Sequence, residues 1–324
     1  MQRLASPDAP GGPPAGPPEG GGEPPAAPSG EPGVPSAPPA GAPAAPSSGP
    51  GLTPPLHLAL LGGPRVTLSP SPAMHCRAMA QAGLRGAYLP FRAEAGDLPL
   101  ILPALLALGF RGLNVTVPLK EAVLPLLARL SPAAAAIGAA NTLLASPAGW
   151  EGHNTDAPGF AEAFLKDLAP CPALVLGAGG AARAALRALL DGGFSPSVSS
   201  RRPEAAAALA REFSEKSGRE VRPVPWLRFG GPWRLAVNAL SASSPEELGE
   251  SPPDPSLEPG GLMADLNYGR PRNWFRERAL ASGASFRDGL PMLAAQARLS
   301  FILWTGRDDV PLAPFLEEAM AAAA

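Results

Sequence analysis

Short apolar runs alternate with longer segments of helical spacing along most of the chain. In its first half this pattern predicts strands at 57–62, 86–90 and 112–117, helices at 72–82 and 98–108, and then helices and a hairpin over 119–152. Glycine and proline punctuate these segments, as at Gly62-Gly63-Pro64 and at Pro118, where a strand is expected to end. Alternating strands and helices are typical of the α/β class.

A second series of alternating elements begins near residue 172. It predicts strands at 173–176, 197–200, 235–238 and 261–265, helices after the first two strands, and two further helices at 290–304 and 314–323. Strands that are apolar along their whole length suit a parallel sheet covered on both faces. The pattern therefore predicts two α/β domains, of which the second is doubly wound and Rossmann-like.

The first 55 residues differ from the rest in composition. Proline and glycine make up about half of them, and none of them is aromatic. Such a segment cannot bury enough apolar surface to offset the entropy lost when it becomes ordered. We therefore expect residues 1–55 to form a disordered tail rich in proline, glycine and alanine, whose PxxP matches follow from composition alone.

Charge and cysteine content narrow the class of protein. The formal net charge of −2 gives no reason to expect a nucleic acid or a membrane surface as partner. No apolar run reaches the ~20 residues of a membrane span, and no signal peptide is expected. Cys76 and Cys171 suit buried thiols in a reducing cytoplasm, and the three histidines have no metal-binding spacing, so no metal is predicted. The sequence does not decide between a monomer and a homodimer.

A glycine-rich turn separates the strand at 173–176 from the helix that follows it. Gly177-x-Gly179-x-x-Ala182 is the alanine-ending form of the dinucleotide fingerprint, in the strand-to-helix setting that the fingerprint requires. Gly177 would permit the tight turn, and Gly179 would let a pyrophosphate approach the N–H groups at the helix start. A purely structural turn is the alternative, but the flanking elements favour a dinucleotide.

The end of the next strand indicates which nicotinamide cofactor is used. An enzyme that prefers NAD usually has a carboxylate there, which accepts the ribose hydroxyls. This chain has Ser200-Arg201-Arg202 instead, with no acid before Glu204. Because arginine carries a permanent charge on a planar fork that matches a phosphate, the sequence predicts NADP.

Polar residues that could bind a small substrate occur in the first domain. Ser69 and Ser71 precede a helix start, where they could seat a carboxylate or merely form a turn and an N-cap. Lys120 follows the strand at 112–117 and would project from the edge of the sheet, and Asp156 stands between the two domains. A lysine and a carboxylate can work as an acid–base pair, although from spacing alone both are more often solvated surface charges.

Several of these segments occur together, in the same order, in one known family. The chain resembles the shikimate dehydrogenases over nearly all of residues 57–322. The matching motifs are SPSP at 69–72, NVTVPLK at 114–120, ANTL at 140–143, NTD at 154–156, GAGGAAR at 177–183, SRR at 200–202, DGL at 288–290 and AQA at 295–297. The resemblance implies the reversible, NADPH-dependent reduction of 3-dehydroshikimate to shikimate, a step in the biosynthesis of chorismate and the aromatic amino acids.

The resemblance also implies domains and residue roles. Residues 56–157 would form the substrate-binding catalytic domain, 158–287 the NADP-binding domain, and 288–324 helices that pack back on the substrate domain. Lys120 would be the acid–base residue, with Asp156 as its partner. The substrate would contact Ser69, Ser71, Thr116, Lys120, Asn141, Asp156, Tyr268 and Gln296. The cofactor would contact Gly177, Ala178, Gly179, Gly180, Ala181, Ser200, Arg201, Arg202, Leu266 and Gly289.

Two other functions stay open at this point. A quinate/shikimate dehydrogenase paralogue would take a substrate with one more hydroxyl, and a non-catalytic ligand-binding homologue would keep the fold without the reaction. The chain also departs from the family pattern at several positions, none of which removes a proposed catalytic group. These are Leu68 in place of histidine, Ser200 in place of asparagine, Ala157 and Pro291 in place of glycine, and Asn273-Trp274 in place of Thr-Pro.

Overall fold

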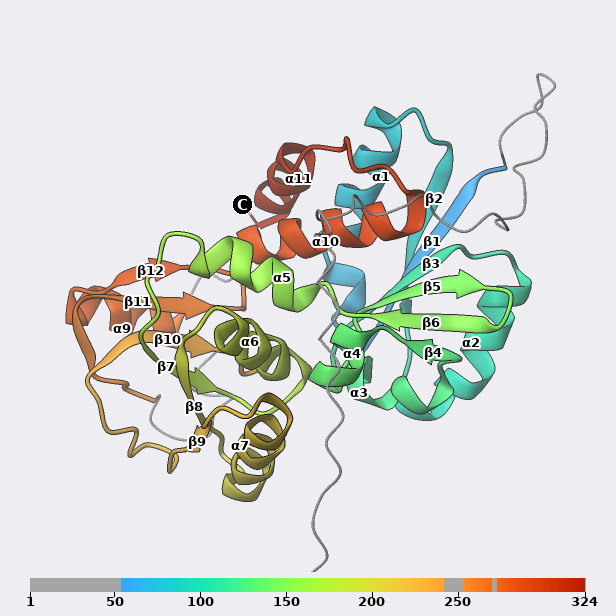
Figure 1. The fold of residues 1–324 in the computed structure, drawn as a ribbon. Coiled ribbons are helices and arrows are strands. Elements are labelled where there is room, and N and C mark those ends of the chain that lie inside the picture. The colour runs from blue at the N-terminus through green and yellow to red at the C-terminus, as the bar shows by residue number, and fades with distance from the viewer. Residues whose placement is uncertain (1–53, 242–252, 270–272, 324) are drawn as a thin grey trace, which may run out of the picture. The chain divides into compact units, whose positions relative to one another are not determined.

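The structure, a computed structural model, describes residues 54–241, 253–269 and 273–323. Apart from residues 54 and 55, the tail predicted at 1–55 lies outside these ranges. All the elements below belong to one unit of contacts, residues 52–324, which contains two six-stranded sheets (Figure 1). The predicted α/β class is thereby confirmed.

The first sheet is mixed, with the strand order β2-β1-β3-β5-β6-β4. Its strands are β1 (Leu56–Gly62), β2 (Gly86–Arg92), β3 (Gly112–Val115), β4 (Arg129–Leu130), β5 (Thr142–Ser146) and β6 (Gly149–His153). β1 pairs in parallel with β2 and β3, and β5 runs antiparallel to β3 and β6. β3 ends two residues earlier than predicted, because the Leu119 N–H bonds back to the Thr116 carbonyl and closes a turn there.

Helices cover both faces of this sheet. They include α1 (Ser71–Gln81), α2 (Leu98–Ala107), α3 (Leu119–Ala122) and α4 (Pro132–Ile137). Because side chains alternate along a strand, β1 sends Leu58 and Leu60 to the apolar cluster that contains α1. It sends Ala59 and Leu61 to the opposite cluster, against α2. The strand is therefore buried on both sides.

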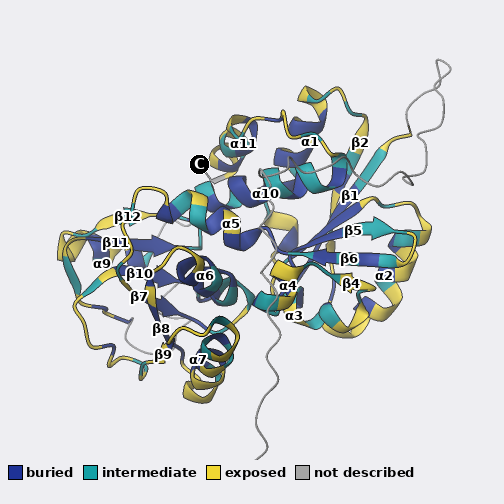
Figure 2. Ribbon diagram, in the orientation of Figure 1, coloured by how far each residue is buried: buried dark blue, intermediate teal, exposed yellow. Residues whose placement is uncertain are grey.

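The second sheet is parallel throughout, with the order β12-β11-β10-β7-β8-β9. Its strands are β7 (Pro172–Leu176), β8 (Ser195–Ser199), β9 (Arg222–Pro223), β10 (Trp233–Asn238), β11 (Leu257–Asp265) and β12 (Ser285–Arg287), and its helices include α6 (Gly180–Asp191), α7 (Pro203–Ser217) and α9 (Trp274–Ser282). Numbered from β7, the order is 6-5-4-1-2-3, which is the doubly wound arrangement that binds dinucleotides where the strand order reverses, between β7 and β10. Figure 2 shows the central strands of this sheet buried, which confirms the predicted Rossmann-like fold.

Two helices from distant parts of the chain lie side by side between the sheets (Figure 1). α5 (Asp156–Phe160) continues into a π-helical turn at 161–165, and α10 (Leu290–Thr305) precedes α11 (Ala313–Ala323). They pack closely, since a Cβ on Gly159 would lie 3.0 Å from the Cβ of Gln296. The domain boundary expected at residue 157 therefore falls inside a helix.

The cysteines differ from expectation. Cys171 is half-buried, but Cys76 is exposed, so the prediction of two buried thiols is wrong for Cys76. α1 turns Met74, His75 and Met79 toward the core, which leaves Cys76 on the outer face of the helix. In the described ranges no helix has the length and apolarity to cross a membrane, and no three His, Cys, Asp or Glu side chains are placed to hold a metal.

His75 is fully buried in a cluster of aromatic rings. Its ring stacks on Tyr88 with centroids 4.4 Å apart, and Trp304, Phe315 and Phe301 surround it. Burial lowers its pKa from 6.5 to about 3, and a weaker contribution from Asn114 acts in the opposite direction. Among these neighbours only Tyr88 titrates, and burial raises its pKa, so it stays neutral in acid.

His75 should make the fold sensitive to mild acid. The unfolded chain takes up a proton on this side chain below pH ~6.5, whereas the folded chain does so only near pH 3. Stability present above pH ~6.5 is therefore lost as the pH falls, by about 2 kcal/mol at pH ~5. We expect the urea midpoint to drop more between pH ~7.5 and pH ~5 in the wild type than in His75→Phe. Equal drops in the two proteins would contradict the prediction.

Candidate active site

A lysine and a carboxylate form a nearly buried ion pair between the two sheets. Lys120 lies in the first turn of α3 rather than at the end of the preceding strand, and Asp156 is the first residue of α5. The Lys120 Nζ donates to the Asp156 Oδ2 at 2.6 Å, and the two side chains are 13% and 6% exposed. Their near-burial distinguishes this pair from a solvated surface contact.

The Asn141 amide joins Asp156 to other predicted site residues. Its Nδ2 donates to the Asp156 Oδ1 at 3.0 Å and to the Gln296 Oε1 at 3.2 Å. Its Oδ1 accepts the backbone N–H of Thr155 at 2.7 Å. Gln296 comes from α10, so side chains separated by 155 positions in the chain converge on one amide.

A second layer of polar side chains lies behind Asn141. Asn114, Thr142, Thr155 and Ser300 are buried, and the Thr142 and Ser300 hydroxyls lie 2.7 Å apart. The Asn114 Nδ2 donates to Thr142 and Ser300, and its Oδ1 accepts from Tyr88. Sequence reasoning missed this layer as a unit. One signal was present, because Ser300 lies one helical turn after Gln296 on the otherwise apolar, buried face of α10.

The two predicted serines lie at the start of α1. The Ser69 Oγ donates to the Ser71 Oγ at 3.0 Å and accepts the Ser71 N–H at 3.2 Å. Because the Ser71 N–H is bonded to Ser69 and Pro72 has no N–H, the Ala73 N–H is the group of this first turn that stays available to an anion. Tyr268 follows β11 of the second sheet, yet it packs on the α1 cluster of the first sheet. Burial raises the pKa of Tyr268, against a hydrogen bond with Ser69.

Thr116 is half-buried where the chain leaves β3. Its N–H donates to the Leu61 carbonyl at 2.9 Å, and its methyl group fills the space where a Cβ on Gly62 would lie. On a continuous strand Thr116 and Asn114, which lie two positions apart, would share a face. Because the strand ends between them, Asn114 belongs to the buried layer and Thr116 to the turn.

The glycine turn after β7 fits a dinucleotide pyrophosphate. Gly177 has φ +124°, a conformation that side chains disfavour, and a Cβ there would approach the Ala239 carbonyl oxygen to 2.8 Å. Gly179 is the N-cap of α6 and has no side chain to cap the helix. A Cβ at this position would have no neighbouring atom of the described residues within 4 Å. The helix N-terminus is thus open to an anion. Nearby, the Ser199 hydroxyl is buried and has no partner among the described residues.

The residues predicted to read the adenosine phosphate follow β8. The buried Ser200 accepts the Arg202 N–H with its Oγ at 3.1 Å, and Arg201 and Arg202 are exposed. On the other side of the sheet centre, a Cβ on Gly289 would lie 2.5 Å from the Leu266 carbonyl oxygen, so these two predicted residues are in contact. Ala178 and Ala181 flank Gly179 and Gly180 in the same turn.

A buried acid that sequence reasoning missed organises the loop after β11. The Asp265 carboxylate accepts from the side chains of Asn238, Asn267 and Asn273, and from the Asn267 N–H. Burial raises its pKa, and these hydrogen bonds act the other way. The carboxylate therefore fixes the loop that carries Leu266 and Tyr268.

Three of the departures from the family pattern fit the helices in which they lie. Asn273 is the N-cap of α9, and its Oδ1 accepts the N–H groups of Phe275 and Arg276. Pro291 lies in the first turn of α10, where a missing N–H costs nothing. The Ala157 N–H donates to the Asn154 Oδ1 at 3.1 Å. None of the three therefore disturbs its helix.

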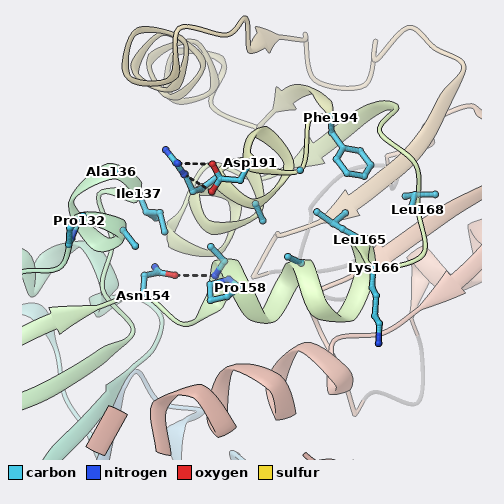
Figure 3. Close-up of a pocket in the computed structure, with 16 residues that line it drawn as sticks. Pro132, Ala136, Ile137, Asn154, Pro158, Leu165, Lys166, Leu168, Asp191 and Phe194 are labelled. Carbon is cyan, nitrogen blue, oxygen red and sulfur yellow. Dashed lines mark hydrogen bonds and ion pairs between the residues drawn. The ribbon is translucent and has the colours of Figure 1, made fainter. Parts of the chain in front are cut away.

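A hollow of about 840 Å³ lies elsewhere, among α4, α5 and α6. Figure 3 shows its mainly apolar lining, from Pro132 and Ile137 on α4 to Asp191 on α6, with Lys166 at its edge. None of the predicted site residues lines it. The candidate active site is therefore the polar cluster around Lys120 and Asp156, together with the open turn after β7.

A doubly wound sheet with an open dinucleotide turn, joined to a domain with a buried lysine–carboxylate pair, is typical of a two-domain oxidoreductase that uses a nicotinamide cofactor. A family model described as the shikimate dehydrogenase substrate binding domain matches residues 61–143, and a shikimate dehydrogenase (NADP(+)) of Thermus thermophilus is 45% identical over 258 residues, covering 78% of this chain and 93% of that protein. The chain belongs to the shikimate dehydrogenase family, which confirms the resemblance seen in the sequence.

Solved structures agree with this assignment. A Thermus thermophilus shikimate 5-dehydrogenase in complex with NADP(H) and shikimate superposes with a TM-score of 0.70 at 40% identity, covering 82% of this chain and 99% of that one. A Corynebacterium glutamicum quinate dehydrogenase in complex with NAD gives a TM-score of 0.72 at 30% identity, with coverage of 82% and 99%. The fold therefore occurs in relatives that differ in both substrate and cofactor.

Proposed function

We propose that this chain catalyses the reversible, NADP-dependent reduction of 3-dehydroshikimate to shikimate. The observation that carries the proposal is the buried pair of Lys120 and Asp156, with Asn141 and Gln296 bonded around it. A ligand-binding module without catalysis has no need to bury a cation and an anion in contact, since burial of a pair costs desolvation energy.

Lys120 would exchange the proton of the reaction. Bound NADPH supplies a hydride to the ketone carbon, and the carbonyl oxygen then needs a proton. The ammonium of Lys120 donates that proton, and in the reverse direction its amine accepts it from the hydroxyl. Asp156 orients the Lys120 Nζ from 2.6 Å and balances its charge. The pair thus serves both directions of the reaction.

The remaining polar residues would bind the ring acid. Ser69, Ser71 and Tyr268 lie together at the start of α1, where their hydroxyls suit a carboxylate. Asn141, Gln296, Asp156 and Thr116 offer amide, carboxylate and hydroxyl groups to the ring hydroxyls.

The second sheet would hold the cofactor. Gly177, Ala178, Gly179, Gly180 and Ala181 would surround the pyrophosphate at the start of α6. Ser200, Arg201 and Arg202 would bind the adenosine phosphate, and Leu266 and Gly289 would line the nicotinamide. We assign residues 56–157 and 288–324 to the substrate domain and 158–287 to the NADP domain. The unpaired cysteines agree with a cytoplasmic location.

A spectrophotometric comparison tests the proposal. The purified chain should reduce NADP with shikimate, measured by absorbance of NADPH, and the value of kcat/KM should be higher with shikimate than with quinate and with NADP than with NAD. The quinate arm is included because a quinate dehydrogenase shares the fold. Faster turnover of quinate would assign the chain to that activity, and no turnover of either acid would overturn the proposal.

A further inference from the structure

Arg183 ends the GAGGAAR motif, and the proposed function gives it no task. It lies near the start of α6, three residues after Gly180. We call the first sheet with its helices the first lobe and the second sheet with its helices the second lobe. The Arg183 Nε donates to the carbonyl oxygen of Ile137, the last residue of α4 in the first lobe, at 2.8 Å. Its guanidinium pairs with Glu212 of α7 and lies over the Phe213 ring, with 12% of the side chain exposed. A largely buried cation thus joins the two lobes.

The chain of the first lobe is shaped around this arginine. Gly138 follows α4 with φ +70°, a left-handed conformation that ends the helix. A Cβ on Gly138 would lie 2.4 Å from the Arg183 Nη2. The left-handed φ favours glycine at this position, and the missing Cβ leaves room for the guanidinium. The contact is a close fit rather than a chance approach of two surfaces.

The segment that Arg183 holds, residues 137–141, leads directly to the acid–base pair. The Ala140 N–H donates to the Lys120 carbonyl oxygen at 2.9 Å, which fixes the backbone of the lysine. The next residue, Asn141, donates to the Asp156 carboxylate at 3.0 Å. Lys120 and Asp156 are therefore both hydrogen-bonded to the segment 137–141. The first residue of this segment, Ile137, is itself hydrogen-bonded to Arg183 of the second lobe.

The first turn of α6 also touches the lysine itself. A Cβ on Gly180 would lie 3.1 Å from the Lys120 Cβ and 3.2 Å from its Cδ. The stem of Lys120 thus packs on the same helical turn that offers its N–H groups to a pyrophosphate. One rigid element contacts the cofactor position, the lysine stem and, through Arg183, the segment behind the lysine.

We propose that Arg183 is a positioning residue, which locks the start of α6 to the segment 137–141 and so sets the Lys120–Asp156 pair relative to the cofactor. This inference rests on the proposed function. Small errors in the placement of reacting groups are costly, because a displacement of ~1 Å can reduce a rate by roughly 10²-fold. Loss of Arg183 should accordingly slow the chemical step more than it weakens binding.

The test compares Arg183→Ala with Arg187→Ala. Arg187 lies one turn further along α6 and makes only a partly exposed pair with Asp191 among the described residues. We expect kcat of Arg183→Ala to fall by roughly 10- to 100-fold, with KM values within about threefold of the wild type. Free guanidinium at millimolar concentration should restore part of the activity of Arg183→Ala and leave Arg187→Ala unchanged.

Hydrogen exchange of the ligand-free protein supplies a readout independent of activity. The Ala140 and Asn141 amides, which bond to the Lys120 and His153 carbonyls, should exchange about tenfold faster in Arg183→Ala than in the wild type or Arg187→Ala. Should Arg183→Ala fail to fold, Arg183→Lys takes its place, because it keeps the charge and removes the planar fork.

Unchanged exchange of these amides, or a kcat equal to that of Arg187→Ala, would overturn the role of Arg183. A wild-type protein inactive on shikimate would instead overturn the proposed function. The two failures are therefore distinguishable.

Discussion

Replacement of Lys120 by methionine should lower kcat by roughly 10²–10⁴-fold, the usual scale for loss of an acid–base group. Methionine keeps an unbranched stem, so the contact with Gly180 is preserved while the proton donor and the ion pair with Asp156 are lost. KM for shikimate should change much less than kcat, because the other polar groups proposed to bind the ring are kept. Steady-state rates measured in both directions would check the prediction.

The control for this experiment is Lys166→Met. Lys166 is exposed at the edge of the hollow shown in Figure 3, away from the Lys120–Asp156 pair. Its replacement should leave kcat within about twofold of the wild type. A Lys120→Met enzyme with comparable activity would show that another group, or water, transfers the proton.

Replacement of Arg201 by aspartate should lower kcat/KM for NADP by roughly 10²-fold, as a charge-assisted contact of about 1.5–3 kcal/mol is lost and a repulsion is added. The aspartate would repel the 2′-phosphate and accept hydrogen bonds from the free ribose hydroxyls of NAD. The efficiency with NAD should therefore stay level or rise. The ratio of the two efficiencies, measured with saturating shikimate, is the quantity to compare.

The matched control is Arg211→Asp. Arg211 is an exposed residue of α7, the helix that begins just after Arg202. Arg211→Asp changes the net charge by the same amount as Arg201→Asp, but Arg211 does not lie at the end of β8. A comparison of the two variants therefore distinguishes the loss of a contact with the cofactor from an effect of net charge. If the ratio of the efficiencies with NADP and NAD is unchanged in Arg201→Asp, Arg201 does not contact the cofactor.

Much of the fold followed from local patterns in the sequence. The short apolar strands, the glycine turn and helices such as α10 were predictable, because their apolar pattern and flanking residues are strong signals. β9 was missed, since its two residues, Arg222 and Pro223, are exposed and form no apolar run. α9 was missed as well, because its helical character depends on the Asn273 cap more than on an apolar stripe.

The site was predictable as a set of motifs, whereas its geometry was not. No spacing in the chain indicates that Asn141 bonds to Gln296, since that contact depends on how α10 packs against α5. The Asp265 network was missed for a similar reason. Asn267 and Asn273 follow Asp265 closely in the chain, but Asn238 lies on β10 and meets Asp265 only when β10 and β11 pair.

The return of α10 and α11 to the first sheet has a consequence for synthesis of the chain. Phe301 and Trp304 of α10, together with Phe315 of α11, complete the cluster that buries Leu58 and Met74. During synthesis, the face of the first sheet that carries Leu58 therefore stays partly uncovered until α10 and α11 have been made. The second lobe can fold in that interval, whereas the apolar core of the first lobe is complete only after α11 has left the ribosome.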